Sequence, residues 1–131
     1  MDWARVMSKA VAIGCGAAVG ANLRFFFGWW ARRAFESEFP WGTFFVNLAG
    51  SFLIGLAAAF ALRNDWDHRL SAFVIVGALG GFTTFSAFSS ENLEMLRNGR
   101  YDLLAFNVLG SAVIGLMLAW GGFNLAQKIS G

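Results

Sequence analysis

The chain has 131 residues, of which 57% are hydrophobic and 14% are charged, and its formal net charge is +2. This composition excludes an ordinary soluble enzyme and predicts a single domain, residues 1–131, that is integral to a membrane. With one His and one Cys, the chain cannot build a metal cluster, a disulfide or a catalytic dyad from its own side chains, so we expect no enzymatic activity. The small charge is spread over several loops, and we expect no nucleic-acid partner.

Four segments are long and apolar enough to span a bilayer, whose hydrocarbon core is about 30 Å thick and needs about 20 helical residues. The first, about 10–31, is uncharged except for Arg24; cations precede it as in a signal peptide, but its apolar run is too long for one. Uncharged runs follow at 43–62, 70–90 and 103–127. We therefore expect an all-α membrane protein with four transmembrane helices, at about 5–33, 43–63, 69–97 and 102–128.

The third span contains an unusual run, residues 80–89, with the sequence GGFTTFSAFS. Every backbone polar group in hydrocarbon needs a partner, so paired glycine followed by hydroxyl residues predicts a broken helix that faces protein or water. We place the break near Gly80–Thr83.

The loop charges give little preference for one orientation in the membrane. An excess of Lys and Arg normally marks the cytoplasmic side. Here the two sides divide these residues five to four, as Arg5, Lys9, Arg63, Arg69 and Lys128 against Arg32, Arg33, Arg97 and Arg100. This balance predicts that the chain inserts both ways up and forms an antiparallel homodimer; the alternative is one orientation set by the N-terminal cations.

Two polar side chains lie inside spans where exposure to lipid is costly. Arg24 would cost roughly 3 kcal/mol at full depth, so we expect it to face a water-filled vestibule that attracts anions. The alternative is that Arg24 snorkels to an interface about one turn away. Asn47, in the second span, offers amide donors either to a polar path or to an interhelical hydrogen bond.

Two rows of side chains are candidates for the walls of a polar path. Phe85 and Phe88 share one face of the third helix with Glu91 and Asn92 near its end. The edge of an aromatic ring is electropositive and can approach an anion, although packing or lipid contact is an equally good interpretation of these two rings.

The second row is Asn107 and Ser111, four residues apart in the fourth span. Ser86 and Ser89 add hydroxyls near the phenylalanines. The alternative for the three serines is a hydrogen bond back to the carbonyl four residues earlier.

Small residues recur at helical spacing and permit close helix packing, either within one chain or between two chains. They are Gly16 with Gly20, Gly50 with Ala57, and Gly110 with Ala119.

Three segments in order, residues 16–25, 42–52 and 80–89, resemble the Fluc (CrcB) family of bacterial fluoride channels, and the resemblance covers all four helices. It implies a multi-pass protein of the bacterial inner membrane that forms a dual-topology antiparallel homodimer. Two pores, each lined by both copies, would export cytoplasmic fluoride passively. The resemblance also implies a structural Na⁺ ion at the dimer centre, with fluoride, membrane lipid and a second copy as partners.

The resemblance also assigns roles to individual residues. Phe85 and Phe88 match the pore-lining rings, and Asn47 matches the pore amide. The backbone carbonyls of Gly80 and Thr83 match the sodium ligands. The remaining matches are Arg24 in the vestibule, Ser111 in the polar track and Glu91 just after the rings. Ala87 and Asn107 depart from the Thr and Tyr found in other members, which puts the donor set of the track in question.

A different class shares the four-helix plan, namely small proton-coupled multidrug exporters. Their mechanism requires a carboxylate inside the membrane to exchange protons for cationic substrate. The first span carries Arg24 instead, and Glu91 lies near a helix end. A purely structural assembly subunit is a third possibility, but it leaves the two polar rows unexplained.

Overall fold

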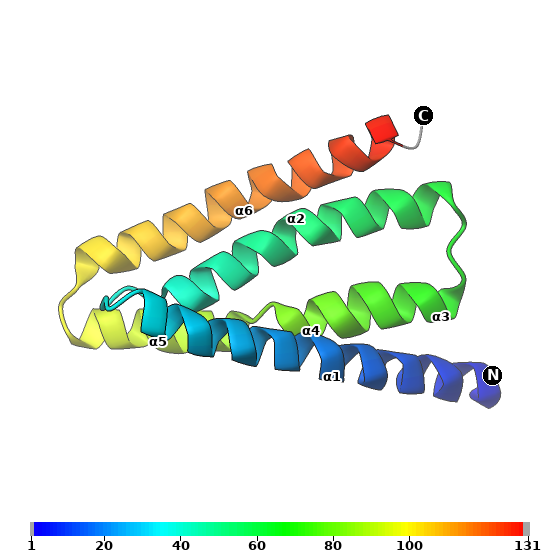
Figure 1. Ribbon diagram of the computed structural model, residues 1–131, viewed down its shortest axis with the longest axis horizontal. Coiled ribbons are helices and arrows are strands. Elements are labelled where there is room, and N and C mark those ends of the chain that lie inside the picture. Colours follow the sequence, from blue (N-terminus) through cyan, green and yellow to red (C-terminus); the bar gives the residue numbers. More distant parts are fainter. Residues whose placement is uncertain (1, 130–131) are drawn as a thin grey trace.

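The computed structural model describes residues 2–129, and within them it contains helices and no strand. Four helical spans, Trp3–Ala34, Trp41–Arg63, His68–Arg97 and Tyr101–Ile129, are long and apolar enough to cross a membrane. This confirms the expected all-α fold of a multi-pass membrane protein. Figure 1 shows that each span runs antiparallel to the one before it in the chain, so that the start of the first span and the end of the fourth lie at the same end of the bundle.

The first two spans are regular helices, α1 (Trp3–Ala34) and α2 (Trp41–Arg63). Asp2 caps α1, because its Oδ1 accepts the Arg5 N–H at 3.3 Å. With 32 residues and a rise of 1.5 Å per residue, α1 is about 48 Å long, so it exceeds the hydrocarbon core. The fourth span is also one helix, α6 (Tyr101–Ile129).

The third span is built from four pieces. They are α3 (His68–Ser71), the π-helix η1 (Ala72–Leu79), α4 (Gly80–Phe82) and α5 (Phe85–Arg97). Between α4 and α5 the backbone of Thr83 is extended (φ −77°, ψ 156°), and so is that of Thr84 (φ −149°, ψ 119°). The expected break is confirmed, and Figure 1 shows it as the coil between the two helices.

The sequence suggested that the paired glycines break the helix, but in the structure they do not. Gly80 has ordinary helical angles (φ −64°, ψ −37°), and the interruption begins three residues later. Gly81 instead provides space, because a Cβ there would lie 2.7 Å from the Ala17 carbonyl oxygen of α1. The hydroxyl residues after the glycines, rather than the glycines, adopt the extended conformation.

The small residues pack within one chain. A Cβ on Gly16 or Gly20 would overlap backbone oxygens of η1, and one on Gly77 would lie 2.7 Å from the Ile13 carbonyl oxygen. In the other helix pair, a Cβ on Gly122 of α6 would overlap the Phe52 carbonyl oxygen of α2. The bundle therefore consists of two tight pairs, α1 with η1 and α4, and α2 with α6, as Figure 1 also shows.

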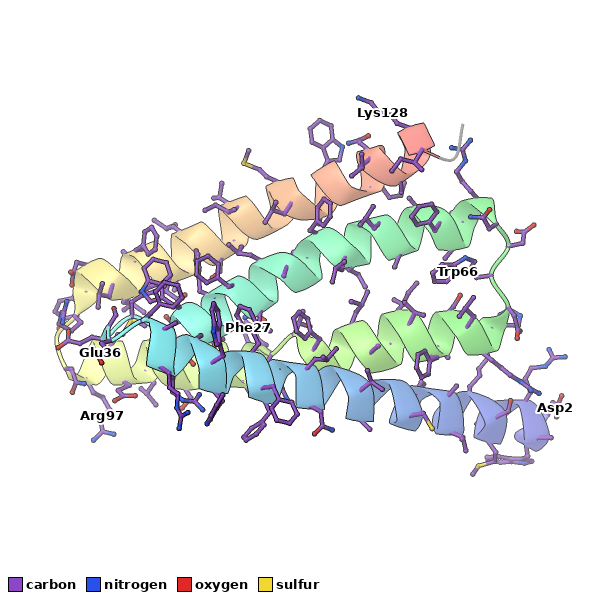
Figure 2. All side chains as sticks on the ribbon, in the orientation of Figure 1. Asp2, Phe27, Glu36, Trp66, Arg97 and Lys128 are labelled. Atoms are coloured by element: carbon purple, nitrogen blue, oxygen red, sulfur yellow. The ribbon has the colours of Figure 1, made fainter. Side chains whose placement is uncertain are left out.

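An aromatic cluster closes the end of the bundle opposite the termini. Phe39 of the α1–α2 loop is 6% exposed and packs edge-on against Trp41, Phe44 and Phe106. Figure 2 places Glu36 and Arg97 at this end, and Asp2, Trp66 and Lys128 toward the other. The charged side chains labelled there mark the two polar ends of the spans.

Candidate ion pathway

The interruption of the third span is held by an amide from α2. Asn47 Nδ2 donates to the Thr84 carbonyl oxygen at 3.1 Å, and Asn47 Oδ1 accepts the Thr84 N–H at 2.9 Å. The second bond takes the place of the helical bond of the Thr84 N–H, a group that hydrocarbon would otherwise leave unpaired. Asn47 thus forms an interhelical hydrogen-bonded link at the break, which we call the amide clasp. One of its two amide hydrogens stays available to another acceptor.

Carbonyl groups at the break lose their helical donors, and those of Gly80 and Thr83 are among them. The Thr84 N–H, which a continuous helix would give to the Gly80 carbonyl, goes to Asn47. The Ala87 N–H, which would serve the Thr83 carbonyl, goes to Thr84 Oγ1 at 3.2 Å. Both carbonyl groups therefore keep lone pairs for another ligand.

Arg24 reaches this same place from α1. Its Nη1 lies 3.4 Å from the Thr83 carbonyl oxygen, and the side chain is half-buried. The guanidinium therefore faces the bundle interior rather than snorkelling to an interface. It also lines a hollow of about 200 Å³ together with Thr43, Thr84 and Glu91.

Thr84 also lines a larger open cavity of about 330 Å³. Asn47, Gly80, Thr83 and Phe85 line it, so it collects the predicted pore amide, the two predicted sodium ligands and one predicted pore ring. Gly50 makes this arrangement possible, since a Cβ there would overlap Thr83 Cγ2.

The two predicted rings lie at the start of α5. Thr84 caps this helix, and the ring centroids of Phe85 and Phe88 are 5.7 Å apart at an interplanar angle of 33°. Phe85 is 80% exposed in the single chain, although it lies at the middle of a span. Ser86 Oγ is 3.3 Å from Thr84 Oγ1, and Ser89 is exposed one turn further along α5.

The fourth span contributes a separate polar group. Asn107, which is 2% exposed, donates from Nδ2 to Asn92 Oδ1 of α5 at 2.9 Å. Ser111 Oγ donates to Asn107 Oδ1 at 3.5 Å, rather than to the carbonyl four residues earlier. The two polar rows expected from the sequence therefore meet at the contact between Asn92 and Asn107.

Glu91 lies toward the end of the bundle that carries the aromatic cluster around Phe39. Its Oε1 accepts the Thr43 hydroxyl at 2.6 Å, while its Oε2 is buried and has no hydrogen-bond partner among the described residues. It borders a hollow of about 420 Å³ that also includes Arg32 and the loop from Phe35 to Pro40. The cavity beside Arg24 and the cavity beside Arg32 thus follow one another from the break to this end of the bundle, with Thr43 and Glu91 lining both.

Comparison with known proteins gives the family. Residues 11–123 match the family described as CrcB-like protein, Camphor Resistance (CrcB). The chain belongs to the CrcB family. A curated relative named fluoride-specific ion channel FluC from a strain of Thermus thermophilus is 38% identical over 125 residues, which cover 95% of this chain and 98% of the relative.

Other relatives of the same name agree in length and similarity. The one from Agrobacterium fabrum is 36% identical over 94% of this chain and 99% of its own, and the one from Parabacteroides distasonis is 37% identical over 94% and 96%. Membership in the CrcB family confirms the resemblance noted from the sequence. The comparisons give no support to a multidrug exporter.

The sequence did not single out Thr84 or Thr43, and it left the partner of Asn92 unidentified. Thr84 was read as one hydroxyl among several, although a threonine directly before a helical run is a recognised capping signal. Thr43 lies four residues before Asn47 and so shares its face of α2. Asn92 was placed on the correct face of α5, but its partner Asn107 could not be known without the fold.

Proposed function

We propose that this CrcB-family protein is a fluoride-selective channel that exports cytoplasmic fluoride passively across the bacterial inner membrane. The observation that carries the proposal is the break in the third span, where an amide clasp, an arginine and two aromatic rings converge in otherwise apolar surroundings. Near-full-length relatives named fluoride-specific ion channels support the same function. We assign no chemical reaction to the protein.

The anion path would use neutral donors in its narrow part. Fluoride is small and strongly hydrated, so a pore must replace its water with donors that are weak enough to release it. The second Asn47 N–H, the Ser86 and Ser89 hydroxyls and the edges of Phe85 and Phe88 would provide such donors. The Ser111 hydroxyl would join them by exchanging its bond to Asn107 Oδ1 for one to the anion. Arg24 would raise the local anion concentration beside this path, and Glu91 with Asn107 would border it.

The break also fits a sodium ion. Carbonyl oxygens are hard ligands suited to a hard cation, and the Gly80 and Thr83 carbonyls are among those that the interruption leaves without helical donors. In a dimer, two copies of this pair would provide four oxygens. The positive charge of the ion would offset the build-up of negative potential in a nearby anion path.

A second, inverted copy would complete the site. Phe85 is 80% exposed beside the open hollow at mid-membrane, which a partner chain would cover. An antiparallel arrangement accords with the balanced loop charges, because the same sequence must then be stable either way up. Each pore would be lined by both copies, with lipid around the outside.

The deciding experiment is fluoride efflux from proteoliposomes that contain the purified protein, compared with chloride efflux from the same vesicles. Fluoride release without chloride release is the expected result. Release of a cationic drug driven by a proton gradient, with no fluoride flux, would instead support the exporter mechanism.

A further inference from the structure

The end of the bundle that carries both termini has a hollow that the proposed pore does not use. It lies between the start of α1 and the start of α3 and has a volume of about 430 Å³, a size typical of small-ligand sites. Arg5, Lys9 and Arg69 place three cationic side chains on its wall, and Asp2 and Asp67 place two carboxylates there.

Local pairing accounts for only part of this charge. Asp2 is engaged with Arg5, whose N–H it accepts at 3.3 Å and whose Nε lies 3.6 Å from Asp2 Oδ2. Among residues 2–129, Lys9 and Arg69 make no ion pair. Three cations thus face two carboxylates, and the two cations without partners lie on different helices.

The depth of these two cations is fixed by the sequence. Lys9 directly precedes the long apolar stretch of α1 that begins at Ala10, and Arg69 directly precedes the uncharged run that begins at Leu70. The 32 residues of α1 extend beyond a hydrocarbon core of about 30 Å, so its first turns lie at headgroup level. Lipid phosphates occupy the same level, and Leu70, which is 45% exposed, offers apolar surface immediately below it.

We propose that this hollow binds the phosphate of an anionic phospholipid headgroup, with Lys9 and Arg69 as its contacts from the two helices. Basic pockets between transmembrane helices at the headgroup level select anionic lipids through charge. A bound headgroup would link the start of α1 to the start of α3. The site is independent of the anion path, which lies at the break and toward the opposite end.

The test is native mass spectrometry of the full chain in detergent with added phosphatidylglycerol or phosphatidylcholine. Wild type should retain phosphatidylglycerol at least about fivefold more than phosphatidylcholine, and the double variant Lys9→Gln with Arg69→Gln should lose this preference. The matched control is Arg33→Gln with Arg97→Gln, which removes two charges from the other end and should keep the preference. Equal phosphatidylglycerol retention in all three proteins would overturn the proposal.

A second arm separates a lipid from free phosphate and does not depend on the variants folding. The thermal melting temperature of wild type is measured with phosphatidylglycerol, with phosphatidylcholine and with inorganic phosphate alone. The expected result is a rise with phosphatidylglycerol only. A rise of the same size with inorganic phosphate would show that the hollow takes a soluble anion, and equal melting in both lipids would exclude a headgroup site.

Discussion

Asn47 binds both backbone groups of Thr84, with hydrogen bonds of 3.1 and 2.9 Å, at the point where the third span is interrupted. Without them, the Thr84 N–H could return to the Gly80 carbonyl and the helix could close over the break. One side chain on α2 therefore controls the conformation of a different span.

We expect Asn47→Ala to lower fluoride flux by on the order of tenfold or more and to reduce thermal stability, because interhelical hydrogen bonds in membranes contribute about 1–2 kcal/mol each in model peptides. Flux is measured in proteoliposomes and stability by thermal melting. The matched control is Asn124→Ala on α6, whose amide donates to the Trp120 carbonyl of its own helix at 2.9 Å. Similar flux in Asn47→Ala and wild type would exclude the clasp as a functional element.

Gly50→Ala should disturb the break by steric overlap, since the new methyl group would overlap Thr83 Cγ2. Overpacking of this kind costs about 1–3 kcal/mol. Adding Thr83→Ser should restore stability and flux, because serine lacks the methyl group and keeps a hydroxyl for the Leu79 carbonyl. A double variant as impaired as Gly50→Ala alone would show that the contact with Thr83 is not the cause.

Phe88→Ile should strongly reduce fluoride flux while the dimer stays intact, because isoleucine has no electropositive ring edge to present to an anion. The measurement pairs the efflux rate with size-exclusion chromatography. Phe26→Ile is the control, since Phe26 is 61% exposed on α1 and lines neither cavity at the break. Flux at the wild-type rate in Phe88→Ile would reject its assigned role in the pore.

Replacing Na⁺ with N-methylglucamine should weaken the dimer and suppress fluoride flux, because the Gly80 and Thr83 carbonyls would then lose their proposed cation. Dimer content is followed by subunit exchange at graded Na⁺ concentrations. The dependence should weaken in Asn47→Ala, where the Thr84 N–H can satisfy the Gly80 carbonyl. If dimer content in the wild type is unchanged without Na⁺, the sodium site does not exist.

A cysteine in the α5–α6 turn tests the orientation. Asn98→Cys in a Cys15→Ala background should react with a membrane-impermeant thiol reagent from both sides of the membrane in comparable amounts. The balanced Lys and Arg count predicts this outcome. Labelling from one side alone would establish a single orientation and remove the basis for an antiparallel dimer.

The fold was predictable where length and hydrophobicity decide it, but contacts between distant residues were not. The four spans follow from uncharged runs, and the break follows from glycines and hydroxyls at mid-membrane. Its position at Thr83 and Thr84, however, depends on Asn47, which lies 37 residues away in sequence, and no local pattern reports that bond. The role of Gly81, the close approach of Ala17, is equally non-local, so the sequence shows Gly81 only as part of the break.

The same limit applies to Asn107. Its spacing from Ser111 correctly indicated a polar row, yet its 2% exposure and its bond to Asn92 make it an inward-facing link between α5 and α6. Sequence spacing identifies the face of a helix, but only packing decides whether that face meets water, an ion or another amide.

The interruption divides the third span between two neighbours. Its first half is packed through glycines against α1, while α5 is joined to α6 through Asn92 and Asn107. Amide hydrogen exchange should therefore report two cooperative units that open separately, one on each side of Thr83. The two units would remain connected by the interruption at Thr83 and Thr84 and by the α1–α2 and α2–α3 loops, so one unit could loosen while the other stays folded.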